Sequence, residues 1–271
     1  MKHSKAQVRR KDFAVTQIAD NTYWINEFDV DCCYLLTGTE KALLIDTGTG
    51  LGDLAGLVRE LTDLPVTVIA THAHLDHVGG AGQFDQVFVH QRDITRFERF
   101  MRTRPMRKVF IRTLSNLPGI SPGDVMKDPH KPSFIPIEDG HVFSLGERNI
   151  RVLHTPGHTK GSIVLIDDKE KLLFTGDNIN VSLFMFMPDS VSIEEWQEGA
   201  RAILELAKTH TAYCGHLPGR QPLEQLHETY AIADTIIRKH PKNALLWKPA
   251  FYPAKDTLPQ IVYNLINVHR R

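Results

Sequence analysis

The run Thr71–Gly80 (THAHLDHVGG) carries the densest group of chemically active side chains in this chain of 271 residues. Imidazole and carboxylate groups are common ligands of zinc, iron and manganese ions. In a strand, residues 72, 74 and 76 would share one face and 77 the other; in a helix, the pairs 72/76 and 74/77 would lie on different faces. Convergence of all four therefore predicts a loop. The four candidate ligands are His72, His74, Asp76 and His77.

The number of ligands in this run favours two metal ions. A catalytic zinc ion takes three protein ligands and keeps one position open for water, so four side chains exceed the need of one ion. Later segments supply further candidates, each at the end of an apolar run or beside a Gly/Pro turn: His158 in HTPGHTKG, Asp177 in LLFTGD and His216 in CGH. A carboxylate between two cations is suited to bridge them, which favours Asp177 for that role.

Three neighbouring residues are interpreted as supporting groups. Asp46, in LLIDTG, is a carboxylate that could orient a ligand imidazole through its second nitrogen, although an ordinary turn aspartate fits the spacing nearly as well. His154 is interpreted as structural. Cys214, two residues before His216, is expected to be a buried small hydrophobe and not a ligand.

The elements that must position these residues alternate between strands and helices. Apolar runs at 22–27, 32–38, 41–46 and 66–70 predict strands, and the amphipathic stretch 52–65 predicts a helix, so the fold class is α/β. The second half repeats strands over 141–179 and becomes helical near 192–210 and 222–240. We expect a single domain over 1–271, with a helical, arginine-rich, lid-like insertion at about 92–136 and a helical C-terminal part.

Composition restricts the partners. Lys plus Arg and Asp plus Glu both total 32, so no net field attracts nucleic acid or an anionic membrane. The basic start lacks the apolar centre of a secretory signal, and no apolar run approaches the length of a membrane span. We therefore expect a cytoplasmic protein with a small-molecule substrate and without nucleic-acid or membrane partners; a homodimer is left open.

In this order of ligands the sequence resembles the metallo-β-lactamase superfamily. The resemblance covers about Asp46 to His216 and implies a four-layered αββα sandwich. It also implies that His72, His74 and His158 bind one ion, that Asp76, His77 and His216 bind the other, and that Asp177 is shared. The details are more similar to the glyoxalase II and lactonase branches. However, the basic, tyrosine-bearing glutathione segment of the former and the tyrosine after the bridging aspartate of the latter are absent.

The resemblance and the ligand set together predict a dinuclear metallo-hydrolase. The cofactors would be two divalent ions, zinc by preference and iron or manganese as alternatives. A metal-bridging hydroxide would cleave an ester, thioester or lactone, with Asp76 as a candidate proton shuttle. The segment Leu183–Met187 could receive an acyl or aromatic group, or could equally be core. The alternatives are a phosphodiesterase or nuclease-type hydrolase, whose arginine-rich segment would hold phosphates, and a non-catalytic metal-loaded binding or regulatory protein.

Overall fold

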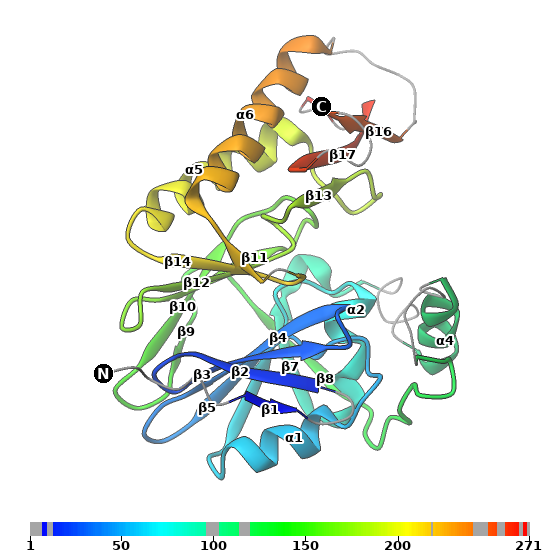
Figure 1. The fold of residues 1–271 in the computed structure, drawn as a ribbon, viewed down its shortest axis with the longest axis vertical. Coiled ribbons are helices and arrows are strands. Elements are labelled where there is room, and N and C mark those ends of the chain that lie inside the picture. The colour runs from blue at the N-terminus through cyan, green and yellow to red at the C-terminus, as the bar shows by residue number, and fades with distance from the viewer. Residues whose placement is uncertain are drawn as a thin grey trace. The chain divides into compact units, whose positions relative to one another are not determined.

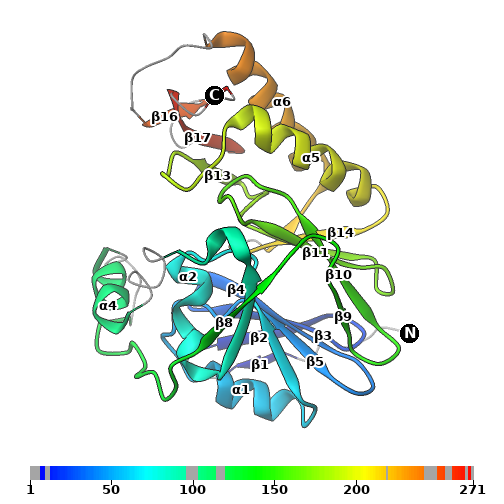
Figure 2. The same ribbon diagram turned by 180° about the vertical axis from the view of Figure 1, so that it is seen from behind.

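The computed structural model describes residues 7–9, 13–95, 103–113, 120–217, 219–240, 249–253, 258–265 and 268–269. The chain forms two compact units, which are treated separately below. The first contains residues 1–137 and 142–150, and the second contains residues 138–141 and 151–271. Figures 1 and 2 show their elements from opposite sides.

The first unit is built around an eight-stranded sheet whose strands follow the chain order from β1 to β8. Strands β1 to β5 are antiparallel, whereas β5 to β8 run parallel to one another. The strands are β1 (Gln7–Arg9), β2 (Phe13–Ala19), β3 (Thr22–Glu27), β4 (Asp31–Thr37), β5 (Ala42–Ile45), β6 (Val66–Ile69), β7 (Gln86–His90) and β8 (Ser133–Ile137).

Helices connect the parallel strands of this unit. They are α1 (Leu54–Leu61), the one-turn α2 (Leu75–Val78) and α4 (Arg104–Thr113), with 3₁₀ turns η1 (Gly79–Gln83) and η2 (Gln91–Asp93). Helix α1 begins where the Asp53 carboxylate accepts a hydrogen bond from the Gly56 amide at 2.8 Å, because the first amides of a helix lack backbone acceptors. Its apolar side buries Leu54, Leu57 and Val58 in the core of the sheet.

Two further sheets are formed mainly by strands of the second unit. One is six-stranded, in the order β15-β14-β12-β11-β10-β9, and the other is three-stranded, in the order β13-β17-β16. The remaining strands are β9 (Val142–Ser144), β10 (Asn149–His154), β11 (Ile163–Asp167), β12 (Leu172–Gly176), β13 (Ser182–Met185), β14 (Thr211–Cys214), β15 (Arg220–Gln221), β16 (Pro249–Tyr252) and β17 (Gln260–Asn264). Residues 142–150, which include β9, belong to the first unit.

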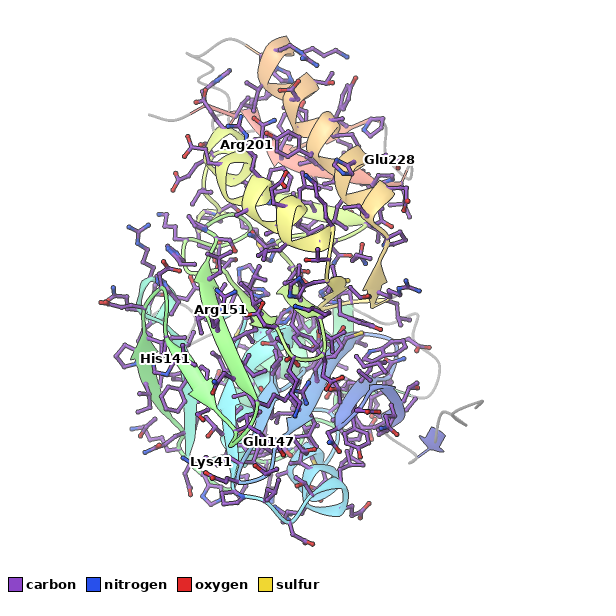
Figure 3. The ribbon with its side chains drawn as sticks, turned by 90° about the vertical axis from the view of Figure 1, so that its left-hand side faces the viewer. Lys41, His141, Glu147, Arg151, Arg201 and Glu228 are labelled. Atoms are coloured by element: carbon purple, nitrogen blue, oxygen red, sulfur yellow. The ribbon has the colours of Figure 1, made fainter. Side chains whose placement is uncertain are left out.

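Two long helices complete the second unit: α5 (Ile193–Ala207) and α6 (Leu223–Lys239). Helix α5 begins at the N-cap residue Ser192, whose hydroxyl accepts from the Glu195 amide at 3.1 Å. Both helices bury apolar side chains in one core, including Trp196, Ile203 and Ile236. Charged side chains such as Arg201 and Glu228 project from their outer faces (Figure 3).

The expected lid-like insertion at 92–136 is helical only in part. Helix α4 confirms a helix in it, but its last residues form strand β8, which pairs with β7 in parallel. Pro136 is accommodated in β8 because β8 is the edge strand, where a missing amide donor costs no ladder bond. Arg96, Arg99 and Arg102 lie outside the described residues. The expectation of one domain stays a prediction.

The described part of the chain contains no helix long and apolar enough to cross a membrane.

Candidate metal centre

Two neighbouring parallel strands of the first unit deliver the first group of candidate ligands. Strands β5 and β6 pair with Ile45 opposite Ile69, so the residues that follow them emerge at one edge of the sheet. The Asp46 amide donates to the Ile69 carbonyl at 2.8 Å, which carries the pairing one step further. Residues after the carboxyl ends of parallel strands commonly build sites in α/β sheets. Asp46 and the ligand run that begins at Thr71 meet at this edge.

The buried Asp46 carboxylate fixes the protonation pattern of two histidines. Its Oδ2 lies 2.9 Å from His77 Nδ1 and accepts the Thr71 hydroxyl hydrogen at 2.8 Å. The same hydroxyl oxygen lies 3.2 Å from His72 Nδ1 and has a lone pair left to accept the proton of that nitrogen. Both Nδ1 atoms are therefore donors, and both Nε2 atoms carry the lone pair that a metal ion requires. Asp46 thus lies where the sequence-based interpretation put it, against the second ring nitrogen of a candidate ligand.

The ligand run is not wholly a loop as predicted. His72 and His74 precede helix α2, whereas Asp76 and His77 are on it, with His74 at its N-cap. Helix α2 turns the chain within one turn, so that His72 and His74 of the extended segment lie near His77 of the helix. Ligand nitrogens of His72 and His74, and likewise of His72 and His77, lie within 4.8 Å of each other. Half-buried Asp76 lies in the first turn of α2, next to His77 in sequence.

The glycines after this run permit close packing and do not supply a left-handed turn. Gly79 has φ −61°, but a Cβ on it would lie 2.4 Å from the Thr49 carbonyl oxygen. A Cβ on Gly80 would similarly lie 2.2 Å from the Thr47 oxygen. The two glycines thus allow α2 and η1 to pack closely against the loop that follows β5. This close packing keeps His77 beside Asp46.

Two acidic residues of this unit were missed by the sequence analysis. The Asp93 carboxylate accepts from the Ala73 amide at 3.1 Å and so holds the peptide between His72 and His74. Buried Asp31, the first residue of β4, places its Oδ1 3.9 Å from His77 Nε2. An acidic side chain at the start of the apolar strand CCYLLT was the available signal, but only the fold places it near His77.

The second unit delivers its candidate ligands by a matching arrangement. Strands β12 and β14 are parallel, with Gly176 opposite Cys214, so Asp177 and His216 follow at the same edge. His216 Nε2 lies 3.0 Å from Asp177 Oδ2, and His158 Nε2 lies 3.8 Å from the same oxygen. The second unit therefore brings its three predicted ligands together around one carboxylate oxygen, as a bridging role for Asp177 requires.

His158 is held rigidly in its loop. Its Nδ1 donates to the Phe184 carbonyl at 2.6 Å, which leaves Nε2 as the nitrogen with a lone pair. Its amide donates to Asn178 Oδ1 at 3.0 Å, and its carbonyl accepts from Ser190. A Cβ on Gly157 would lie 2.0 Å from Asn178 Oδ1, so glycine is required there. Asn178, directly after Asp177, is a positioning residue that sequence analysis did not identify.

Two residues set aside in the sequence analysis have structural contacts. Cys214 is buried, and burial raises the pKa of its thiol to about 12; its Sγ donates to the His216 carbonyl. Such a thiol is not an effective ligand, because metal binding needs the thiolate. His154 Nε2 lies 2.9 Å from the Lys160 carbonyl, and its amide donates to Asp139. Both interpretations agree with these contacts.

The segment Leu183–Met187 divides between the two roles considered for it. Leu183 and Met185 are fully buried in the core beneath α5 and α6. Phe184 points to the opposite face of β13 and is 42% exposed, with its ring 5.7 Å from that of Phe186. Alternation along a strand explains the division. The expectation of core packing is thus confirmed for Leu183 and Met185, whereas the side chain of Phe184 is exposed on the other face of β13.

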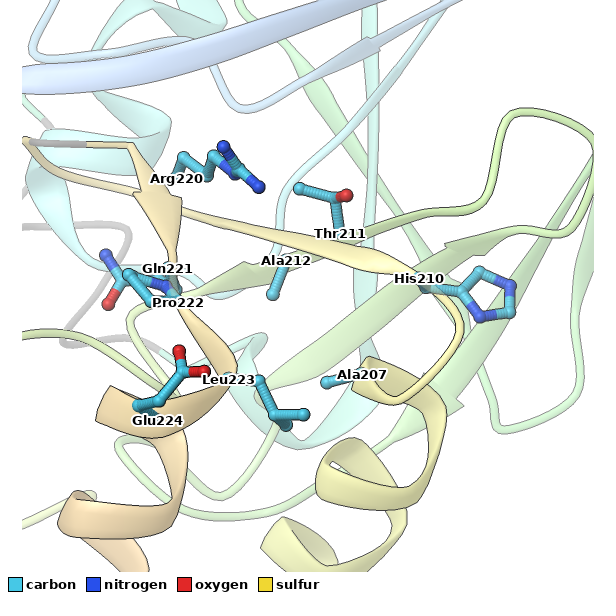
Figure 4. A pocket seen from close by; sticks show the side chains of 9 residues that line it. All are labelled: Ala207, His210, Thr211, Ala212, Arg220, Gln221, Pro222, Leu223 and Glu224. Carbon is cyan, nitrogen blue, oxygen red and sulfur yellow. The ribbon is translucent and has the colours of Figure 1, made fainter.

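A separate pocket of about 430 Å³ lies in the second unit between the end of α5, strand β14 and the start of α6 (Figure 4). His210 lines it, but its Nδ1 lies 3.1 Å from the Leu206 carbonyl and its Nε2 lies 3.3 Å from Asp168. None of the seven predicted ligands lines this pocket. It is therefore distinct from the candidate metal centre.

The residues present fit divalent metal ions. Three imidazoles, those of His72, His77 and His158, have a partner for Nδ1 that leaves Nε2 as the ligand atom. Hydrogen bonding of the second ring nitrogen is a usual accompaniment of metal-ligating histidine. The carboxylates of Asp31 and Asp177 lie near such nitrogens, so oxygen and nitrogen ligands of the type preferred by zinc, iron and manganese occur in both units.

The fold and the order of the candidate ligands along the chain are typical of a class of metallo-hydrolases. Comparison with known families identifies the same class. A profile of the metallo-beta-lactamase superfamily matches residues 32–216, which contain all seven predicted ligands. The chain belongs to this superfamily and is a hydrolase of its fold.

Among curated proteins, the chain is similar to the acyl-coenzyme A thioesterase MBLAC2 of Homo sapiens. The two are 32% identical over 216 residues, which cover 72% of this chain and 76% of the human protein. The Gallus gallus protein of the same name is 28% identical over 244 residues, covering 84% and 87% of the two chains.

Solved structures confirm the expected fold class. A metallo-beta-lactamase family protein from Thermus thermophilus aligns with a TM-score of 0.60 and 23% identity, covering 86% of this chain and 85% of that one. The B3 metallo-beta-lactamase BLEG-1 aligns with a TM-score of 0.54 and 22% identity, covering 74% and 92%.

Proposed function

We propose that this protein hydrolyses acyl thioesters, with coenzyme A thioesters as the substrate class. The observation that carries this proposal is the 32% identity to an acyl-coenzyme A thioesterase over most of both chains. The lack of the glutathione-binding tyrosine segment of the glyoxalase II branch agrees with a thiol carrier other than glutathione. Within the range of ester, thioester and lactone bonds, the thioester is thus preferred.

We further propose that the two groups of ligands serve one centre with two divalent ions, zinc by preference. His72, His74 and His158 would hold one ion and Asp76, His77 and His216 the other, with Asp177 shared. Support comes from the ligand order within the superfamily match and from the Nδ1 partners of His72, His77 and His158. When bound, two such ions supply an activated water near neutral pH and polarise the thioester carbonyl.

The residues of the chain itself contribute orientation and proton handling. Asp46 keeps His72 and His77 in the tautomer that presents Nε2, and the Phe184 carbonyl does the same for His158. Asp76 is the candidate to hold a proton on its carboxylate and pass it to the departing thiolate. Asp76 is half-buried in the first turn of α2. Fixed geometry of this kind lowers the cost of reorganisation during reaction.

The acyl group of the substrate would lie on the open face of the three-stranded sheet. Phe184 in β13 and Phe251 in β16 both pair with Val262 in β17, so the three side chains form one row. Phe184 and Phe251 are 42% and 41% exposed. Neighbouring strands are about 4.8 Å apart, so the row extends about 10 Å from the strand whose carbonyl holds His158. An apolar surface that begins at a candidate ligand is suited to an acyl chain.

The arginine-rich segment gives little support to phosphodiester cleavage. Arg107 is fully buried and bonded to Asp128, and Arg104 Nε donates to the Val125 carbonyl at 3.2 Å. These two side chains hold α4 in place and do not face a phosphate. Arg92 and Arg112 remain as exposed arginines within the part of the segment that the structure describes.

A substrate panel tests the proposal. Purified protein would be assayed with acyl-coenzyme A, S-acyl glutathione, an aryl ester, a lactone and a bis-aryl phosphate, before and after removal of metal by a chelator. We expect the acyl-coenzyme A to be hydrolysed fastest, activity to disappear with the metal, and zinc to restore it. Cleavage of the bis-aryl phosphate without thioester hydrolysis would favour the phosphodiesterase alternative. No turnover of any substrate at full metal occupancy would favour the non-catalytic alternative.

A further inference from the structure

We propose that Asp31 is an additional metal ligand, bound to the same ion as His77, and that it weakens the preference of that position for zinc over manganese. This inference rests on the proposed two-ion centre. Asp31 is not among the seven ligands that the sequence motif and the superfamily indicate, and it is the first residue of β4.

The first step is the direction of the His77 lone pair. Asp46 Oδ2 lies 2.9 Å from His77 Nδ1, and a carboxylate can only accept, so Nδ1 carries a proton. In the neutral ring Nε2 then has the lone pair. This nitrogen faces Asp31 Oδ1 at 3.9 Å. Two acceptor atoms thus face each other in a site where both side chains are fully buried.

The second step is the distance itself. At 3.9 Å the two atoms are too far apart for a hydrogen bond, which requires about 3.2 Å or less. One metal–nitrogen and one metal–oxygen bond together span at most about 4.3 Å, when the two ligands lie on opposite sides of the ion. A separation of 3.9 Å therefore accommodates one ion bonded to both atoms. The same relationship occurs in the second unit, where His158 Nε2 and Asp177 Oδ2 are 3.8 Å apart.

The third step is the electrostatic environment of Asp31. Asp31 is 1% exposed. Cys33 Sγ is a weak donor at 4.0 Å from Asp31 Oδ2. A buried carboxylate is stable only when positive charge or strong donors compensate it. A divalent ion bound to Asp31 would supply such a charge.

The ligand types then bear on the choice of metal. With Asp31, the ion at His77 would have three carboxylates (Asp31, Asp76 and Asp177) and two imidazoles (His77 and His216). Zinc favours four ligands rich in nitrogen or sulfur, whereas manganese favours more ligands and more oxygen. The ion at His72 and His74 would lack this extra carboxylate. The two positions should therefore differ in their zinc-to-manganese affinity ratio.

The experiment compares wild type, Asp31→Asn and the control Asp29→Asn, an exposed aspartate two residues earlier. Each metal-free protein would be titrated with Zn²⁺ alone and Mn²⁺ alone, and bound metal would be measured by elemental analysis after equilibrium dialysis. We expect Asp31→Asn to lose at least about tenfold in affinity for one ion, with a larger loss for Mn²⁺, and the other ion to be unaffected. Asp29→Asn should bind both ions as wild type does.

Two outcomes would overturn the inference. Equal affinities in wild type and Asp31→Asn would mean that Asp31 is not a ligand. If instead nitrogen NMR of the zinc-loaded wild type showed both ring nitrogens of His77 protonated, the pair would be an imidazolium between Asp31 and Asp46. This second measurement needs no substitution and so remains valid if Asp31→Asn fails to fold. Binding of two ions with no thioester turnover would refute the proposed function alone.

Discussion

The Asp46 carboxylate lies 2.9 Å from His77 Nδ1, and through the Thr71 hydroxyl it also determines the tautomer of His72. One side chain after the end of β5 thus orients two candidate ligands that follow β6. Asp46 adopts a left-handed backbone conformation with φ 61°, which aspartate tolerates better than most residues. This conformation turns the carboxylate toward the ligand run.

Substitution of Asp46 should therefore weaken metal binding without removing a ligand. Asp46→Asn keeps the shape of the side chain and tolerates the positive φ, but it presents a neutral amide to His77. We expect metal affinity to fall about 10- to 100-fold. Competition with a chromogenic chelator measures this loss. Asp53→Asn, which keeps the cap of α1, is the control and should bind metal as wild type does; equal affinity in both variants would contradict the positioning role.

Phe184 should determine how the enzyme distinguishes acyl chain lengths. Burial of a phenylalanine side chain against a ligand contributes about 1.5–3 kcal/mol, which corresponds to roughly tenfold to a hundredfold in kcat/KM. Phe184→Ser should lower kcat/KM by this amount for long-chain acyl-coenzyme A and leave the acetyl thioester unchanged. Val142→Ser, at a similarly exposed valine of β9, provides the matched control. A uniform loss across all chain lengths would refute the acyl surface while leaving thioester hydrolysis intact.

Arg107 should act as a structural residue of α4. It is fully buried, burial lowers the pKa of its guanidinium despite nearby Asp128, and its Nη2 bonds to the Asp128 carboxylate. Arg107→Ala should cost about 2–4 kcal/mol in the free energy of unfolding because it leaves a cavity. Arg107→Met keeps most of the side-chain volume and should cost less than half as much. The substitution loses the bond to Asp128, but it also removes the desolvation penalty of a buried charge, which offsets that loss. Denaturant unfolding of both variants measures the difference; similar losses would mean that the ion pair dominates.

The Cys214 thiol predicts a loss of stability at alkaline pH. Burial raises its pKa from 9.0 to about 12 in the folded protein. The native state then keeps a proton that the unfolded state releases, so this contribution to stability is full below pH 9 and declines as the pH rises toward 12. Cys214→Ser should reduce the loss of unfolding free energy between about pH 8 and pH 10, and it should keep wild-type metal content. Loss of metal in Cys214→Ser would instead make the thiol a ligand.

The candidate ligands could be identified from the sequence because they follow recognisable strands or adjoin Gly/Pro turns. Each of the runs VTVIA and LLFTG is a strand of its own sheet, and chain direction alone places the residues that follow it at the carboxyl end of that strand. The role of Asp46 was also accessible, since it follows the adjacent strand. The one-turn helix α2 was not predicted, because a four-residue helix has too few positions to show a period.

The positions of Asp31 and Phe184 could not be predicted from the sequence and became visible only in the structure. Asp31 lies 46 residues before His77, and the pairing of β4 with β5 and of β5 with β6 brings the two side chains to 3.9 Å. Phe184 belongs to an apolar run in which every residue type suits a core. The pairing of β13 with β17 decides that Leu183 faces inward and Phe184 outward. Contacts between distant strands are not encoded in local spacing.

Asp177 tests the central claim most directly, because it is the proposed shared ligand of a two-ion thioesterase. The measurement is metal content per chain together with acyl-coenzyme A turnover for wild type, Asp177→Ala and the surface control Asp168→Ala. We predict two ions per chain and rapid turnover for wild type and Asp168→Ala, and a parallel loss of bound metal and turnover in Asp177→Ala. Undiminished turnover in a folded, metal-poor Asp177→Ala protein would contradict the account.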